Sequence, residues 1–254
     1  MIPIGDSVRS RTFPFVNVTI ITLNVLIFLY ELTLGTARLQ PFGLSQLDVF
    51  FFHWGTIPAC LSDRFGYHPD VRAQDLAFYC TNNQAVGSVF YSMFLHGGWL
   101  HLLGNMVFLW VFGDNVEDAM GGARFAVFYV LCGLAAFAAQ ALANPSSAIP
   151  MVGASGAIGG VMGAYARLYP RAPVHLLVIF FVFVNRTVVP AFLMLGYWFL
   201  IQVLGGIPSL ASEAGGVAFW AHVGGFLAGI GLIGVFAKPE RVAAQRALVA
   251  RSPY

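Results

Sequence analysis

The stretch that decides the fold is MVGASGAIGGVMGAYARLY, residues 151–169, in which a serine lies among glycines inside a segment apolar enough to enter a membrane. A lone serine in an apolar helix usually bonds back to its own backbone. Here Gly153 and Gly156 flank Ser155, and the helix-breaking chain NPSSAIP, residues 144–150, precedes it. The pattern predicts that Ser155 lies in the first turn of a helix, beside backbone N–H groups that have no helical partner. Such a turn can hold both a nucleophile and an oxyanion, so a base has to be sought elsewhere.

The composition is that of an integral membrane protein. Of the 254 residues, 58% are hydrophobic and only 9% are charged, against about 25% charged in soluble domains. Too few polar side chains remain to cover a water-soluble globule. The net charge of +2 is small and no basic run is interleaved with aromatic residues, which argues against a nucleic-acid partner.

Long apolar runs predict six membrane-spanning helices, so the expected fold is an all-α polytopic bundle. The expected spans are residues 13–30, 99–118, 125–143, 151–169, 188–206 and 217–236. The run PVHLLVIFFVFV, residues 173–184, is apolar but too short to cross, and we expect it to lie at the membrane interface. The run LDVFFFHW, residues 47–54, is expected to lie there too.

The basic residues predict the orientation of the bundle. Arg9 and Arg11 precede the first span, and Lys238 begins a basic tail, so the positive-inside rule puts both ends in the cytoplasm. This requires an even number of crossings, which six satisfies. We therefore expect a cytoplasmic segment at 1–12, a six-span domain at 13–237 with a long first outer loop at about 36–90, and a cytoplasmic tail at 238–254. A bacterial cell membrane is the expected location.

Two of the three cysteines share the long loop. Cys60 and Cys80 lie in its polar part, whereas Cys132 lies in an apolar run and is interpreted as a packing residue. A disulfide can join the loop pair if the loop faces an oxidising compartment, and the sequence leaves the bridged and free states open.

Polar side chains in the expected spans give the candidates for a base and its partners. His101 and Asn105 are four residues apart on one helix face, and His96 comes five residues before His101. Polar groups on one face of a membrane helix usually mark a site, although a hydrogen bond between helices is the alternative. His222 stands near the start of the last span.

These groups are expected to lie at similar depth. Ser155 is twelve residues before Arg167, roughly 18 Å along a helix. His222 is sixteen residues before Lys238, roughly 24 Å along a helix. Both therefore fall in the outer half of the bilayer, and Asn105 enters from the same side.

Three motifs in order carry a family resemblance. They are GASG at 153–156, His96 with the pair His101 and Asn105, and AHVGG at 221–225. Together they resemble the rhomboid family of intramembrane serine proteases over nearly the whole chain, from about Thr12 to Phe236. The resemblance implies cleavage of transmembrane protein substrates within the lipid, near the outer end of the cleaved segment, without a cofactor or a metal.

The resemblance also implies a role for each motif residue. Ser155 would be the nucleophile and His222 the general base. His101, Asn105 and the backbone N–H of Ser155 would form the oxyanion hole. Four further motif residues would support this site: His96, Gly153, Gly156 and Gly225.

Two departures from the family pattern stand out. Some members place a tyrosine one turn after the serine, where it stacks on the histidine, but this chain has Gly159 there. What orients His222 is therefore open. Some members also carry a Trp-Arg pair in the first loop, whereas Trp54 has no adjacent arginine.

Other function classes fit the sequence less well. No His-Glu-x-x-His motif is present for a metalloprotease, and the His-rich second span has no counterpart in the second half, as a transporter built of inverted repeats would require. The remaining alternative is a non-catalytic rhomboid-like protein that binds membrane helices. Because Ser155 and His222 are both present, the catalytic interpretation is favoured.

Overall fold

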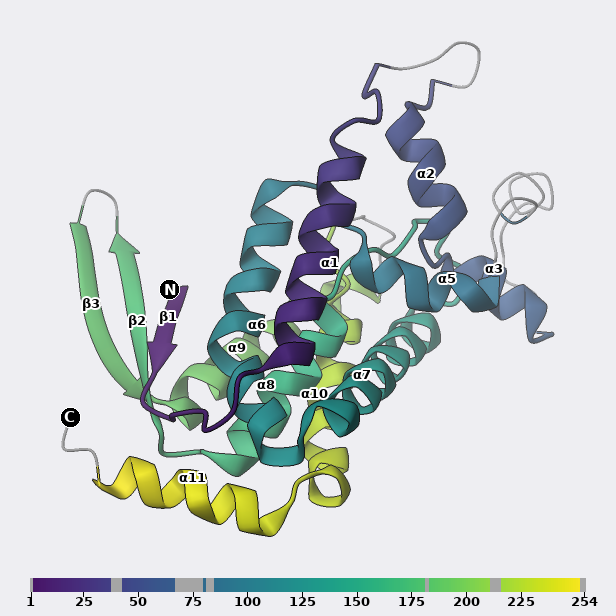
Figure 1. Ribbon diagram of the computed structural model, residues 1–254. Coiled ribbons are helices and arrows are strands. Elements are labelled where there is room, and N and C mark those ends of the chain that lie inside the picture. The colour runs from purple at the N-terminus through teal and green to yellow at the C-terminus, as the bar shows by residue number, and fades with distance from the viewer. Residues whose placement is uncertain are drawn as a thin grey trace.

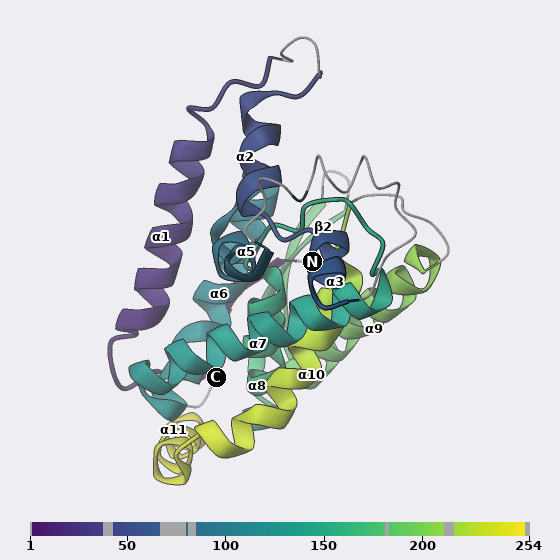
Figure 2. The ribbon, with the colours of Figure 1, turned by 90° about the vertical axis from the view of Figure 1, so that its right-hand side faces the viewer.

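The computed structural model describes residues 2–37, 43–66, 80, 85–180, 183–210 and 216–251. Within these ranges the chain is mostly helical, and the helices gather around α8 (Ser155–Leu168), which is buried along most of its length. Four longer helices pack against α8: α6 (Trp99–Met120), α7 (Gly122–Ala143), α9 (Ala191–Ser209) and α10 (Phe219–Phe236). The helix α1 (Phe15–Glu31) stands beside α6 (Figure 1) and at the edge of the bundle (Figure 2).

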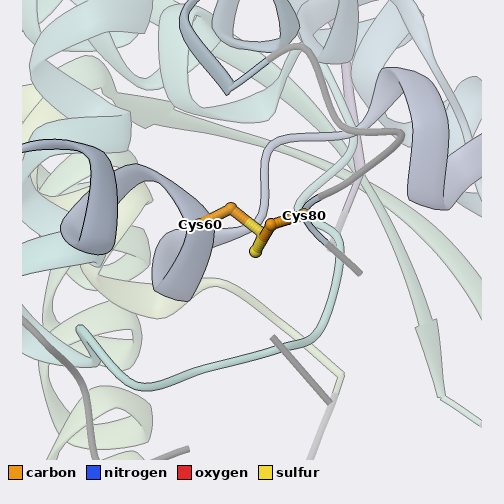
Figure 3. The surroundings of a disulfide bond; sticks show 2 residues. All are labelled: Cys60 and Cys80. Carbon is orange, nitrogen blue, oxygen red and sulfur yellow. A yellow bond between two sulfur atoms is a disulfide. The ribbon is translucent and has the colours of Figure 1, made fainter. Parts of the chain in front are cut away.

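The long first loop folds at one end of the bundle. It contains short helices α2 (Gln46–Trp54), α3 (Pro58–Arg64) and α5 (Ala85–Tyr91), followed by the 3₁₀ helix η1 (Ser92–Phe94). The last helix, α11 (Pro239–Arg251), crosses the opposite end (Figures 1 and 2). A disulfide joins Cys60 of α3 to Cys80 (Figure 3), so the bridged state is the one found. Cys132 is buried in α7 as a free thiol.

Each segment expected to span the membrane contains a helix, but the helices differ in length. Among the described helices, α7, α9 and α10 are each long and apolar enough to cross a membrane. The α5–η1 segment and α6 satisfy the same test only as a pair, bent by 86° at the break between them. α1 has 17 residues and α8 has 14. The structure thus supports three or four crossing helices by length and composition, and six crossings remain a proposal.

The chain is mostly helical, but the expectation of an all-α fold is wrong, because three segments form strands; the interfacial position of 173–184 stays a prediction. The chain forms a hairpin of β2 (Pro173–Phe180) and β3 (Phe183–Pro190), and β1 (Ile2–Asp6) pairs antiparallel with β2. Val174 and Leu176 are buried on one face of β2 while His175 is exposed on the other, which is the alternation of a strand. Because Pro190 is extended and caps α9, that helix begins at Ala191, later than expected.

The segments expected to flank the domain pack on it. Val8 and Val242 are buried in the main core, and the hydroxyl of Tyr165 in α8 donates to the Asp6 carboxylate. In α11, Gln245 is buried, and its Nε2 donates to the carbonyl of Asn115 at 3.2 Å. The boundaries 13–237 therefore leave out β1 and α11, which belong to the same packed unit.

The closest helix contact joins the backbones of α8 and α10. A Cβ added at Gly225 would lie 1.9 Å from the carbonyl oxygen of Gly156, and one added at Gly229 would lie 1.9 Å from that of Gly160. These separations are far below van der Waals contact, so any side chain there would push the two helices apart. Small residues let membrane helices approach in this way.

We predict that Gly225→Val lowers the free energy of unfolding by roughly 1–3 kcal/mol or more, the usual cost of overpacking. The matched control is Gly231→Val in the same helix, because a Cβ at Gly231 meets open space. Thermal unfolding of both variants in detergent measures the difference. Equal melting temperatures for the two variants would contradict the backbone contact.

The Asp6 carboxyl should make stability depend on pH. Burial, with a smaller contribution from the nearby Asp114, raises the pKa of Asp6 from 3.8 to about 7. The folded state then holds this proton over a range in which the unfolded state has lost it. The free energy of unfolding should therefore fall as pH rises from about 4 to about 7. Asp6→Asn should flatten this slope in thermal unfolding at pH 4 to 8; an unchanged slope would refute the assignment.

Candidate active site

Ser155 is the first residue of α8, at the point where the chain turns into the helix. The preceding backbone is anchored to η1, since Gly153 N–H donates to the carbonyl of Ser92 at 2.8 Å. Gly153 has φ +124°, a backbone conformation that residues other than glycine rarely adopt. Since Ser155 opens the helix, its own N–H and those of the next residues have no carbonyl partner within α8. The hydroxyl thus lies beside donors suited to a negative oxygen.

His222 of α10 contacts this serine directly. Its Nε2 lies 2.8 Å from Ser155 Oγ, a hydrogen bond between residues 67 positions apart. The first turn of α10 is fixed from α7, because Gln140 Oε1 accepts from the N–H groups of Trp220 at 3.1 Å and Ala221 at 3.2 Å. With the α8–α10 contact below it, this cap sets where the imidazole lies.

Two side chains of α9 also contact the His222 ring. His222 Nδ1 lies 2.7 Å from Gln202 Oε1. The ring of Trp198 lies 5.7 Å from the imidazole, centroid to centroid, at an angle of 38°. A Cβ at Gly159 would meet the Trp198 ring at 3.7 Å, so the tryptophan approaches the position where some relatives carry tyrosine. Two residues of α9 thus contact the imidazole.

His96, His101 and Asn105 form a second cluster next to Gly153. Asn105 Nδ2 lies 2.9 Å from His96 Nε2, and His96 Nδ1 lies 3.3 Å from the carbonyl oxygen of Phe94. A carbonyl only accepts, so His96 Nδ1 carries the proton and Nε2 accepts from the Asn105 amide. The second N–H of Asn105 remains for a ligand.

The side chains of His101 and Asn105 lie next to Gly153, two residues before Ser155. A Cβ at Gly153 would lie 2.6 Å from His101 Nε2 and 3.7 Å from Asn105 Nδ2. The cluster is held from α1, because the buried Glu31 carboxylate accepts the backbone N–H of His96 at 3.1 and 3.2 Å. A cavity of about 20 Å³ reaches Ser155 between η1, α7 and α8.

Sequence reasoning missed Gln202, Gln140 and Glu31 as parts of this site. The signal for Gln202 was available, because it is the one carboxamide in the expected span 188–206. A larger apolar cavity, of about 290 Å³, lies between α1, α2 and α5 and contains none of the candidate site residues. In the part of the chain that the structure describes, no three His, Cys, Asp or Glu side chains gather as metal ligands would.

Comparison with known proteins gives the family. Residues 83–239, more than half of the chain, match the model of the Rhomboid domain. Rhomboid protein 1, mitochondrial, of Saccharomyces cerevisiae is 32% identical over 149 residues, 56% of this chain and 40% of that protein. RHOMBOID-like protein 5 of Arabidopsis thaliana is 39% identical over 72 residues, 28% and 23% of the two chains.

A third relative bears a protease name. Rhomboid protease GluP of Bacillus subtilis is 40% identical over 70 residues, 28% of this chain and 13% of that protein. The matches span less than half of the length of each of these relatives. The family match covers the described helices from α5 to α10, including α7, α9 and α10, which can cross a membrane. The chain is an integral membrane protein that belongs to the rhomboid family.

Proposed function

We propose that this protein is a serine endopeptidase that cleaves transmembrane segments of membrane-protein substrates. The observation that carries the proposal is the 2.8 Å contact between Ser155 Oγ and His222 Nε2. A serine hydroxyl is a weak nucleophile until a base within hydrogen-bond reach accepts its proton. The name of the GluP relative points to the same activity.

In the first half of the reaction, His222 Nε2 takes the hydroxyl proton as Ser155 Oγ attacks the carbonyl carbon of the scissile peptide. The carbonyl oxygen becomes an oxyanion. When the tetrahedral intermediate collapses, the C–N bond breaks and the proton passes from His222 to the leaving nitrogen. One product leaves as an amine, and the other stays on Ser155 as an ester.

The oxyanion needs donors fixed before it forms. The backbone N–H of Ser155, the free N–H of Asn105 Nδ2 and a ring N–H of His101 are the donors we assign. His96 and Phe94 hold the Asn105 amide with its nitrogen toward the site. The donors therefore need little reorganisation during the reaction.

The second half of the reaction needs one water at Ser155. The cavity beside it, about 20 Å³, is large enough for roughly one water molecule. His222 takes a proton from that water as its oxygen attacks the ester carbon. The ester C–O bond then breaks, the acid product leaves, and the proton returns to Ser155 Oγ.

We also propose six crossings, with both chain ends in the cytoplasm of a bacterial cell. The loop end of the bundle carries the Cys60–Cys80 disulfide and the opposite end carries α11 (Figure 1). Disulfides persist in oxidising compartments, so the loop end is assigned to the outside. Arg241 and Arg246 of α11 then lie inside, in agreement with the positive-inside rule.

Loss of the nucleophile should abolish cleavage. With purified protein in liposomes and a transmembrane test substrate, Ser155→Ala should show no turnover, and Asn105→Ala should turn over about a hundredfold more slowly or worse, as expected for one oxyanion donor. Gly104→Ala in the same helix is the matched control, because its Cβ meets open space. If wild type and Ser155→Ala both leave several substrates uncleaved, the protein is instead a non-catalytic binder of membrane helices.

Reporter fusions test the orientation. A green fluorescent protein fused after Tyr254 should fluoresce in a bacterial host, and alkaline phosphatase fused there should be inactive, since each reporter works on only one side of the membrane. Alkaline phosphatase inserted in the 36–66 part of the first loop should be active. The reverse pattern at both sites would overturn the assignment.

A further inference from the structure

The hydrogen bond between Gln202 and His222 is the feature that the proposed mechanism leaves unused. Gln202 lies in α9 and is only 7% exposed. Its Oε1 is 2.7 Å from His222 Nδ1, and its Nε2 is 3.3 Å from the carbonyl oxygen of Trp198 one turn earlier. Both ends of the carboxamide therefore have a partner.

These partners fix which way the amide faces. The Trp198 carbonyl only accepts, so the Gln202 atom beside it is the nitrogen, and the oxygen faces the imidazole. An amide oxygen also only accepts, so His222 Nδ1 must carry the ring proton. In the neutral ring Nε2 then holds the lone pair, and Nε2 is the atom 2.8 Å from Ser155 Oγ. The amide thus selects the one tautomer that can act as a base toward the serine.

The alternative interpretation is that Gln202 is a buried polar side chain whose hydrogen bonds are purely structural. Two observations favour a role. Gln202 is the one carboxamide or charged side chain in α9, in a helix otherwise made almost wholly of apolar residues. Its partner is the single nitrogen of His222 that does not face Ser155. An apolar residue of the same length would cost less to bury, so the amide is explained by what it does to the imidazole.

We propose that Gln202 is a positioning residue that holds His222 in its Nδ1–H tautomer with Nε2 directed at Ser155. This inference rests on the proposed serine protease mechanism and adds a third member to the pair. The amide does the orienting work that a buried carboxylate does in serine proteases of other folds. It carries no net charge, which suits a site surrounded by apolar helices.

The position of Gln202 makes α9 part of the catalytic machinery. α9 also reaches α10 through Phe199 stacked on Phe226, with centroids 4.9 Å apart, and through the Gly206 carbonyl, which accepts from Trp220 Nε1 at 3.1 Å. If α9 moved away from α10, His222 would lose the acceptor for its Nδ1–H. The base is therefore assembled only while α9 is docked.

Two substitutions and a matched control test the proposal. Gln202→Met keeps the length of the side chain but removes the acceptor, whereas Gln202→Glu keeps an acceptor oxygen. Ile201→Met is the control, because Ile201 is the neighbour on α9 and is 41% exposed. The rate at which a fluorophosphonate labels Ser155 reports on the dyad without a membrane substrate, and kcat and KM of cleavage are measured beside it.

Gln202→Met should lower the labelling rate and kcat about tenfold or more, since a base in the wrong tautomer cannot accept the proton. KM should stay within about twofold, because Gln202 is assigned no contact with substrate. Gln202→Glu should recover most of the lost rate, and Ile201→Met should match wild type. Wild-type labelling and kcat in Gln202→Met would overturn the proposal, as would equal losses in Gln202→Met and Gln202→Glu.

A spectroscopic measurement separates positioning from folding. Nitrogen NMR of protein labelled at histidine, with the His222 signals assigned by their loss in His222→Ala, should show a protonated Nδ1 and an unprotonated Nε2 in wild type. A protonated Nε2 in neutral His222 of wild type would refute the proposal even if Gln202→Met failed to fold. If the expected tautomer is present but wild type neither labels nor cleaves, the proposed protease function fails while the tautomer assignment stands.

Discussion

The contact between the backbones of α8 and α10 is the constraint on which the candidate site depends. Ser155 opens α8 and His222 lies in the first turn of α10, and the carbonyl of Gly156 touches Gly225 just below them. A serine side chain is short, so its hydroxyl reaches another helix only if the two helix axes come unusually close. The glycines allow that approach, so the geometry of the site depends on residues that take no part in the proposed reaction.

Placing polar groups in an apolar bundle imposes a second constraint, because an unpaired one is costly. Around Ser155, the side chains of His222, Asn105 and His96 each have a hydrogen-bond partner on a different segment of the chain. Gln202 holds His222, Gln140 caps the helix that carries it, and His96 holds Asn105. The hydrogen bonds that pay for burial also determine the direction of each donor and acceptor. The hydrogen bonds that pair the buried polar side chains are thus the same ones that fix the geometry of the candidate site.

Much of this architecture could be predicted from the sequence, and the misses have physical reasons. Each of the six long apolar runs contains a helix, and in α7, α9 and α10 the helix is also long enough to cross a membrane. The hairpin was missed because both faces of β2 are apolar: Leu177 and Ile179 alternate with Leu176 and Val178, which hides the two-residue period. The role of Gln202 was missed because it depends on how α9 is rotated against α10. One sequence does not contain that angle.

The kinds of polar residue found at each depth follow from the cost of burying charge. The groups that contact or cap the Ser155–His222 pair and its neighbours are the amides Gln202, Gln140 and Asn105, together with imidazoles. Glu31, the carboxylate that holds His96, is the last residue of α1. Carboxylates occur toward the helix ends. Glu117 near the end of α6 accepts from the first N–H groups of α1, and Asp118 pairs with Arg11 at 3.2 Å. An amide orients an imidazole without the desolvation cost of a carboxylate, though it stabilises the imidazolium less. A bundle that works inside lipid therefore gains from a neutral third partner, which is the role assigned to Gln202.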